Sequence, residues 1–129
     1  MVITRTDITF GYQTVMAAHA VADFATQHPE GFAEWHRDSG SIICLAVDDE
    51  AALKHQYEKL KKLIGNDLYG PVHFAEPDIE NQWTSIAFYA TAAVRRKLRH
   101  LGMVGKKEGD LNKTFFAAEA ARLQEASPV

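Results

Sequence analysis

Residues 72–89 constrain the fold of this chain more than any other stretch. They contain two short runs of aromatic and β-branched residues, 72–75 and 83–89, which are typical of strands with a buried face. Between the runs, acids alternate with residues such as Pro77 and Asn81 that interrupt a regular strand. The connection is about seven residues long, too short for a crossover, so the two strands should be antiparallel neighbours.

The connection is also a candidate site. Glu76, Asp78 and Glu80 place three carboxylates where two strands end, and packing does not require them there. Polar clusters at strand ends are where α/β domains usually hold their chemistry. The alternative interpretation is a solvated turn whose acids only keep the protein soluble. The sequence leaves both interpretations open.

The segments upstream alternate between strand and helix patterns. In order, they are a strand at 1–5, a helix at about 12–27, a short helix at 29–37, an apolar strand at 42–47 and a helix from Asp48 or Asp49 to Gly65. With the final strand pair, this order predicts an α/β sandwich with a mostly parallel sheet and an antiparallel last strand.

The helical periodicity predicts which faces are buried. In the long helix ending at Gly65, the apolar positions are Leu53, Tyr57, Leu60 and Ile64. In the helix at 12–27, the predicted core stripe is Val15, Ala18, His19, Ala22 and Ala25. A histidine in such a stripe is more often a structural residue than a catalyst.

The strand at 42–47 is apolar on both faces, which is typical of a strand covered by helices on both sides. Cys44, the only cysteine, lies within it and is expected to be a buried small hydrophobe. One cysteine excludes a disulfide framework and a cysteine metal site.

A basic segment follows the last strand. Six of the chain's 14 lysines and arginines fall within residues 95–107, and a short helix is predicted at 92–101. The cations on this helix are Arg95, Arg96, Lys97 and Arg99. Such an asymmetry favours a phosphate-binding patch, with a solvated helix face as the alternative. The net charge of −3 excludes a uniformly basic nucleic-acid coat.

The length of 129 residues fits one domain, which we assign to 1–104, followed by a linker and a C-terminal helix in 105–129. The helix pattern at 112–125 puts Phe116, Ala120 and Leu123 on one face, with Phe115 beside them. This helix either docks back on the domain or packs against another subunit. No apolar run approaches a membrane span and no signal peptide is evident, so we expect a cytoplasmic protein without a membrane partner.

Several short motifs occur in a recognisable order. Arg5-Thr6-Asp7 follows the first strand, a glycine loop leads into a helix with His19-Ala20, and Asp48-Asp49-Glu50 opens a later helix. The third strand ends in an acid and the fourth opens with Thr84. Over about residues 1–100 this order resembles the type-2 peptidyl-tRNA hydrolases, and Glu76-Pro77-Asp78 resembles their divergent bacterial and phage branch.

The resemblance implies a three-layer fold, in which a four-stranded mixed sheet lies between helix layers, and often a homodimer. It also implies hydrolysis of the ester that joins a peptide to the 3′ ribose of tRNA, without a cofactor. The chain departs from the family at the first helix and at the acidic turn. The loop at 9–14 has no lysine, and Met16 stands where the family has glutamine. The acidic turn is shorter, with Glu76 in the place of an aspartate.

Ester hydrolysis needs a base that activates water and a donor that stabilises the oxyanion. Glu76 or Asp78 is the candidate base, and His19 would orient it or share its proton. Thr84, Gln13 or a backbone amide at the helix start would donate to the oxyanion.

Substrate binding is assigned to polar residues outside this catalytic set. Arg5 and Asp7 of the N-terminal motif, together with Gln13, would contact the substrate, and Arg5 is the nearest cation that could replace the loop lysine. Arg95, Arg96, Lys97 and Arg99 would hold the tRNA backbone through charge.

Two other functions remain open. The first is a non-catalytic module that binds RNA or protein on the same fold. The second is a Mg²⁺-dependent hydrolase using Glu76, Asp78 and Glu80, since Mg²⁺ prefers hard oxygen ligands. Alternate residues of an extended segment point to opposite sides, so a turn would have to bring these three carboxylates together.

Overall fold

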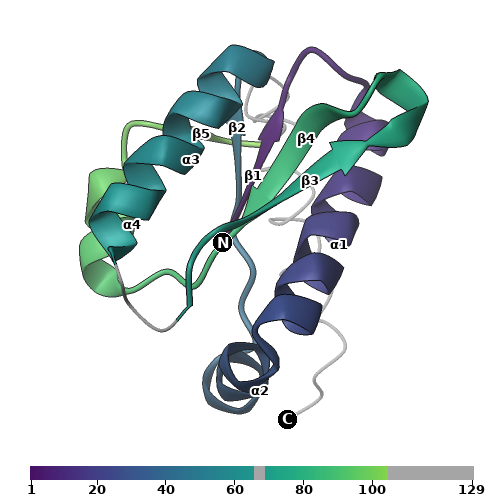
Figure 1. Ribbon diagram of the computed structural model, residues 1–129. Coiled ribbons are helices and arrows are strands. Elements are labelled where there is room, and N and C mark those ends of the chain that lie inside the picture. Colours follow the sequence, from purple (N-terminus) through teal and green to yellow (C-terminus); the bar gives the residue numbers. More distant parts are fainter. Residues whose placement is uncertain (66–68, 105–129) are drawn as a thin grey trace, which may run out of the picture.

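A five-stranded mixed sheet organises the described residues, 1–65 and 69–104, of the computed structural model (Figure 1). The strands are β1 (Val2–Arg5), β2 (Cys44–Val47), β3 (Val72–Glu76), β4 (Gln82–Ala87) and β5 (Gly102–Met103), in the spatial order β3-β4-β1-β2-β5. Only β1 and β2 pair in parallel, and the other pairings in this part of the chain are antiparallel. The α/β class and the antiparallel β4 are confirmed, but the prediction of a mostly parallel sheet is wrong. The resemblance implied four strands and did not anticipate β5, a two-residue strand too short to leave a pattern.

The described helices lie on both faces of this sheet (Figure 1). They are α1 (Phe10–Gln27), α2 (Pro29–Asp38), α3 (Glu50–Ile64) and α4 (Ala92–Lys97). Helix α1 packs against β1, β3 and β4 on one face, while α3 packs against β1 and β4 on the other. Helix α4 packs beside α3, where Val94 and Leu98 join the same core.

Local signals set the helix ends. Thr9 caps α1 by accepting a hydrogen bond from the Tyr12 amide at 3.2 Å, so the helix begins at Phe10, slightly earlier than predicted. Pro29 separates α1 from α2, as expected, and occupies the first turn of α2. Asp49 caps α3, and Gly65 ends it with a φ of 61°, which glycine adopts easily.

The predicted core face of α3 is confirmed. Leu53, Leu60 and Ile64 are buried and Tyr57 is partly buried. Large aliphatic side chains recur here at helical spacing. Since burying each one removes a large apolar area from water, the pattern identifies the face without tertiary information.

The predicted core face of α1 is wrong. Val15 is 49% exposed, and Ala18, His19 and Ala22 are exposed with it, while Ala25 is partly buried. The residues that α1 buries are Gln13, Met16, Ala20 and Phe24. Alanine gains little from burial, so the many alanines carried a weak signal, and the larger Met16 and Phe24 decide which face meets the sheet.

The predicted acidic turn joins β3 and β4 through the short 3₁₀ helix η1 (Pro77–Ile79), with Glu80 and Asn81 in the left-handed region. The register places Phe74 opposite Ser85 and Ala75 opposite Trp83, which leaves Thr84 as the extra residue of a β-bulge. The bulge resets the alternation of β4. The Trp83 ring therefore packs against Tyr57 of α3, while Ser85 donates a hydrogen bond to the Met16 carbonyl of α1 at 2.7 Å.

Replacing His73 by phenylalanine should flatten the pH dependence of stability. The His73 ring stacks on Trp83 with 3.8 Å between ring centroids, and burial lowers its pKa from the ordinary value. A histidine with a lowered pKa stabilises the fold fully above about pH 6.5, and this contribution is lost as the pH falls toward the folded pKa. Urea unfolding at pH 7.5 and 5.5 should therefore show a smaller loss of stability for His73→Phe than for wild type. Equal losses would contradict this role, and exposed His55→Phe serves as control.

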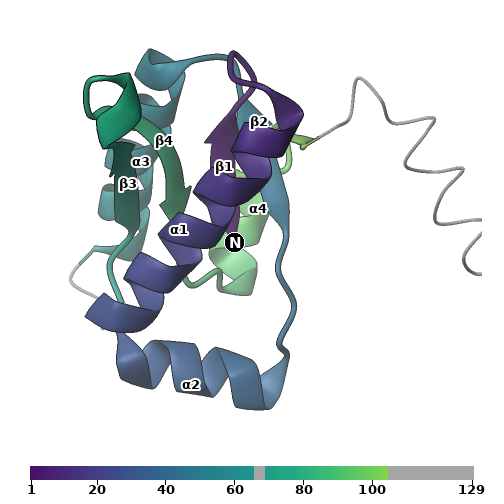
Figure 2. The ribbon, with the colours of Figure 1, turned by 90° about the vertical axis from the view of Figure 1, so that its right-hand side faces the viewer.

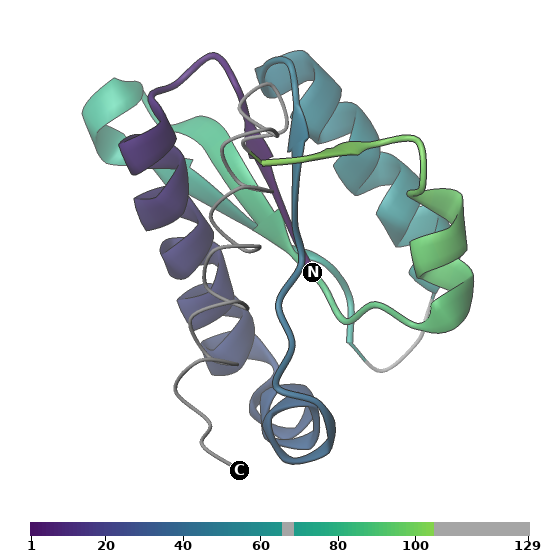
Figure 3. The ribbon, with the colours of Figure 1, turned by 180° about the vertical axis from the view of Figure 1, so that it is seen from behind.

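The burial of β2 differs from the prediction that helices cover both of its faces. Leu45 and Val47 are buried on the α3 side, as expected, but Cys44 and Ala46 on the other side are only partly buried. Helix α1 leaves this side of β2 largely uncovered, because it lies over β3, β4 and β1 (Figure 3). An apolar run indicates that a strand lies in the interior of a sheet, but it does not indicate whether a helix covers each of its faces.

The basic helix is shorter than predicted, since α4 ends at Lys97 and not near residue 101. The predicted helix within 105–129 lies outside the described residues. Among the helices that the structure describes, none is long and apolar enough to cross a membrane.

Candidate functional site

Four of the predicted site residues lie at one edge of the sheet: Arg5, Asp7, Glu76 and Asp78. Strand β1 ends at Arg5 and β3 ends at Glu76, while the antiparallel β4 starts at Gln82 beside them. The loop from β1 to α1 and the η1 turn reach this same edge (Figure 1). We call the group formed by Arg5, Asp7, Tyr12, Glu76 and Gln82 the strand-end site.

Arg5 is the structural centre of the site. Its side chain forms two hydrogen bonds with Asp7, Nε to Oδ1 at 2.6 Å and Nη2 to Oδ2 at 2.7 Å. Its Nη1 donates to Gln82 Oε1 at 2.8 Å and to the Trp83 carbonyl at 3.1 Å. The hydrogen bond raises the pKa of Arg5 and lowers the pKa of Asp7. Arg5, only 7% exposed, therefore clamps the end of β1 to the start of β4.

Glu50 supports this clamp from the α3 side. Its Oε2 accepts a hydrogen bond from the Trp83 amide at 2.7 Å, and its Oε1 lies 3.7 Å from Lys54 Nζ. Sequence reasoning placed Glu50 only in a helix-opening motif and did not assign Gln82 at all. No local signal identifies either role, because that of Gln82 depends on the pairing of β1 with β4 and that of Glu50 on the packing of α3 against β4.

Glu76 differs from the other acids of the turn. It is 8% exposed, whereas Asp78 and Glu80 are exposed. Its Oε1 accepts a hydrogen bond from the Asp78 amide at 3.1 Å. The three carboxylates thus have different environments, and no three His, Cys, Asp or Glu side chains of the described residues are grouped to hold a metal ion. The Mg²⁺ alternative therefore has no support from the geometry.

Tyr12 is a member of the site that sequence reasoning missed. Burial, followed by the negative charges of Glu76 and Asp78, raises the pKa of its phenol. A phenol keeps its proton at neutral pH, and the raised pKa extends this range, so Tyr12 can donate a hydrogen bond. Its position in the first turn of α1 is visible in the sequence, but its closeness to the acidic turn is not.

Two predicted oxyanion donors are engaged inside the protein. Gln13 is buried, where its Nε2 donates to the Ile8 carbonyl at 3.1 Å and its Oε1 accepts from the Thr4 hydroxyl at 3.3 Å. Thr84 is fully buried at the bulge and donates to the Phe74 carbonyl at 3.4 Å. Both side chains are thus buried and hydrogen-bonded within the protein.

His19 lies along β3 without joining the carboxylates. Its exposed ring stacks on Phe74, with 4.4 Å between centroids and 4° between planes. Phe74 precedes Glu76 by two positions and so points to the same face of the sheet. Among the hydrogen bonds of the described residues, none joins His19 to Glu76 or Asp78.

The basic residues lie away from the strand-end site. Arg95, Arg96 and Lys97 are exposed on α4, and the exposed Arg99 follows. Arg95 lines a cavity with Met1 at the start of β1, which is the opposite end of that strand from Arg5. The strand-end edge is instead acidic, with exposed carboxylates in its loops: Asp7, Asp48, Asp49, Asp78 and Glu80.

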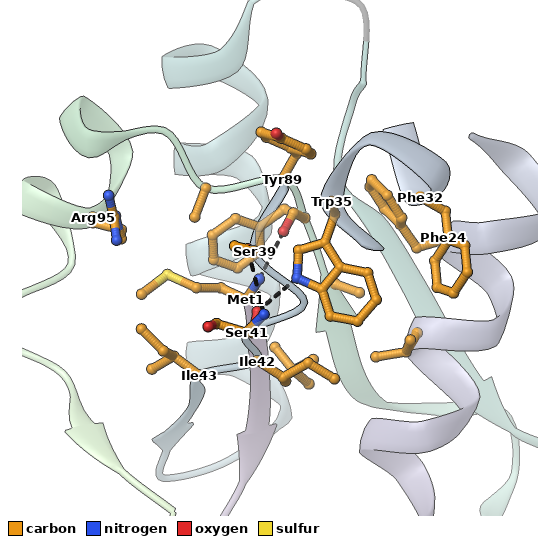
Figure 4. Close-up of a pocket in the computed structure, with 15 residues that line it drawn as sticks. Met1, Phe24, Phe32, Trp35, Ser39, Ser41, Ile42, Ile43, Tyr89 and Arg95 are labelled. Atoms are coloured by element: carbon orange, nitrogen blue, oxygen red, sulfur yellow. Dashed lines mark hydrogen bonds between the residues drawn. The ribbon is translucent and has the colours of Figure 1, made fainter. Parts of the chain in front are cut away.

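A cavity of about 260 Å³ lies at this opposite end of the sheet (Figure 4). It is framed by α1, by α2 and by the segment that leads from α2 to β2 (Figure 2). Its apolar lining includes Phe32, Trp35 and Ile42, and the Trp35 indole donates to the Ser41 carbonyl at 2.6 Å. The aromatic pair of α2 was visible in the sequence, but nothing there indicated that it borders a cavity.

The comparisons with known proteins add no assignment to this geometry: no protein-family model matches the chain, and no curated protein matches its sequence.

Proposed function

We propose that the strand-end site hydrolyses an ester, with Glu76 as the general base. The observation that carries this proposal is a nearly buried carboxylate, Glu76, at the strand ends, and its charge contributes to the raised pKa of the Tyr12 phenol. A base and a hydrogen-bond donor are the two groups that ester hydrolysis requires. Neither requires a metal ion.

In the proposed reaction, Glu76 takes a proton from a water molecule as its oxygen forms a bond to the ester carbonyl carbon. The Tyr12 hydroxyl donates a hydrogen bond to the oxyanion of the tetrahedral intermediate. The carbon–oxygen bond to the alcohol then breaks, and the alcohol oxygen takes the proton held by Glu76. The products are a carboxylic acid and an alcohol, and the Glu76 side chain is again a carboxylate.

The Arg5 clamp has a positioning role in this proposal. Gln82 pairs with Glu76 in the sheet register, and Arg5 binds the Gln82 side chain. A base held by a rigid strand pair keeps its geometry through the reaction, which favours catalysis. Arg5 itself has most of its N–H groups engaged, so its contribution is to hold the site and not to bind the leaving group.

We propose an aminoacyl or peptidyl ester of tRNA as the substrate, following the resemblance to type-2 peptidyl-tRNA hydrolases. The acidic edge repels phosphates, so a tRNA would place only its ester-bearing end there. Its phosphate backbone would then contact the exposed cations of α4, which offer charge without base recognition.

A binding module without catalysis is the second candidate. The engaged side chains of Gln13 and Thr84, together with the separation of His19 from the carboxylates, favour it. Both candidates use the same surface, so binding alone does not distinguish them.

A peptidyl-tRNA cleavage assay with and without EDTA tests the proposal. Cleavage that survives EDTA supports the hydrolase. Binding of tRNA without cleavage supports the module. Cleavage abolished by EDTA and restored by Mg²⁺ would contradict the metal-free mechanism.

The salt dependence of binding tests the tRNA partner. Replacing Arg95 and Arg96 by glutamine should weaken tRNA binding about equally for different tRNA sequences, because phosphate contacts carry no sequence information. The slope of log affinity against log salt should flatten by roughly one unit for each phosphate that the variant no longer neutralises. Lys61→Gln with Lys62→Gln, which removes the same charge from the exposed end of α3, should leave both quantities unchanged. Equal binding by parent and arginine variant would exclude α4 as the tRNA contact.

A further inference from the structure

The face of β2 that points toward α1 lacks a covering helix among residues 1–65 and 69–104. Strand β2 is internal, with β1 on one side and β5 on the other. Cys44 and Ala46 on this face are only partly buried, and Ile42, just before the strand, is 53% exposed. Next to the start of β2 lies the cavity that Phe32 and Trp35 of α2 line (Figure 4). We call the combined surface of Ile42, Cys44, Ala46 and the cavity the β2 face.

The position of α1 on the sheet explains why this face is open. Helix α1 lies over β3, β4 and β1 (Figure 3). Its His19 ring stacks on Phe74 of β3. Its other flank carries Ala17 and Val21 beside the open face, and Val21 lines the cavity. Parallel strand pairs of α/β sheets normally have both faces covered, and β2 pairs in parallel with β1, so a covering apolar element is expected here.

The chain itself continues at this place. The amide of Val104, the last described residue, donates a hydrogen bond to the Cys44 carbonyl at 3.0 Å. Residues 105–111 span up to about 24 Å when extended, which exceeds the roughly 13 Å length of β2. The predicted helix 112–125 is about 21 Å long, enough to cover both the strand and the cavity.

The chemistry of this segment matches the β2 face. Phe116, Ala120 and Leu123 share one helical face, and the charges of residues 112–125 balance. Ile42, Cys44 and Ala46 are apolar, and the cavity beside them is lined by Phe32 and Trp35, with Arg95 as a charged lining residue. A segment tethered this closely has an effective concentration in the millimolar range, far above that of a second copy at micromolar protein. We propose that residues 112–125 dock on the β2 face of their own chain, with Phe116 entering toward Trp35 and Ile42.

The native Cys44 thiol reports on this contact, since it is the only thiol and lies on the β2 face. In the full-length protein, Phe116→Asp should increase the rate of Cys44 alkylation by iodoacetamide about tenfold or more, because the docked state no longer buries a phenylalanine. Ala118→Asp, on the opposite face of the predicted helix, should react within twofold of wild type. Circular dichroism melting confirms that each variant is folded.

A reciprocal variant on the domain keeps the test independent of the tail substitution. Ile42→Asp changes an exposed residue and should accelerate alkylation like Phe116→Asp, while the double variant should add little to either. Alkylation rates should be the same at 2 and 200 μM protein, as these concentrations lie on either side of typical weak dimer affinities. Slower alkylation at the higher concentration would assign the face to a second copy. Wild-type rates in Phe116→Asp, or equal acceleration in Ala118→Asp, would overturn the proposed docking.

Discussion

Replacing Arg5 by leucine should lower the free energy of unfolding by about 2–3 kcal/mol. The substitution removes all four hydrogen bonds of the clamp and leaves the Trp83 carbonyl without this donor. A loss of this size lowers the melting temperature of a domain of this length by about 10 °C. Urea and thermal unfolding of the purified variant measure the effect.

The pH dependence separates the clamp from general packing damage. Because the hydrogen bond to Arg5 lowers the pKa of Asp7, its contribution is present above the unfolded pKa of about 3.9 and is lost as the pH falls through the folded pKa. The difference between Arg5→Leu and wild type should therefore shrink as the pH falls from about 3.9 through the lowered folded pKa of Asp7. Arg37→Leu, which breaks the exposed pair with Asp38, should cost less than about 0.5 kcal/mol. Similar small losses for both variants would show that the clamp does not stabilise the fold.

Replacing Glu76 by glutamine should reduce ester cleavage by about 10²–10⁴-fold, the range that a positioned general base contributes. Glutamine has nearly the same shape, and its amide oxygen still accepts the hydrogen bond of the Asp78 amide. The melting temperature should therefore change little, and the loss would be catalytic. Single-turnover cleavage of peptidyl-tRNA and of a minimal ester measures the rate.

Glu80→Gln is the matched control for this experiment. Glu80 lies in the same turn and carries the same charge, but its side chain is exposed. Its rate should remain within twofold of wild type. Equal losses in both variants would point to the charge of the turn, and an unchanged rate in Glu76→Gln would remove Glu76 as the base.

Features set by neighbouring residues could be predicted from the sequence. The α3 cap, expected at Asp48 or Asp49, is Asp49, and the end of α3 at Gly65 and the core face of Leu53, Leu60 and Ile64 agree with the structure. These signals are local, since a cap bonds within one turn and a helix face repeats every three or four residues. The antiparallel β3–β4 pair was predictable for the same reason, because the short connection permits no crossover.

The sequence indicated where the candidate site lies but not the role of each residue in it. The acidic turn was identified from the sequence, whereas its meeting with Arg5-Thr6-Asp7 at one edge of the sheet follows from the strand order. Which carboxylate is buried depends on η1 and on the register that pairs Glu76 with Gln82. The roles of Tyr12 and Glu50 depend on contacts with residues far along the chain, which no spacing rule encodes.

The sequence by itself determined the α/β class, both ends of α3 to within a residue, the α3 core face and the acidic turn, because each depends on residues close together in the chain. Only the tertiary structure decided which face of α1 is buried, because burying its alanines on either face gains a similar, small free energy. It also decided that Arg5 is a clamp and that the cations of α4 lie away from Glu76. These outcomes depend on strand order and register, which arise from the packing of the whole sheet and not from any one segment.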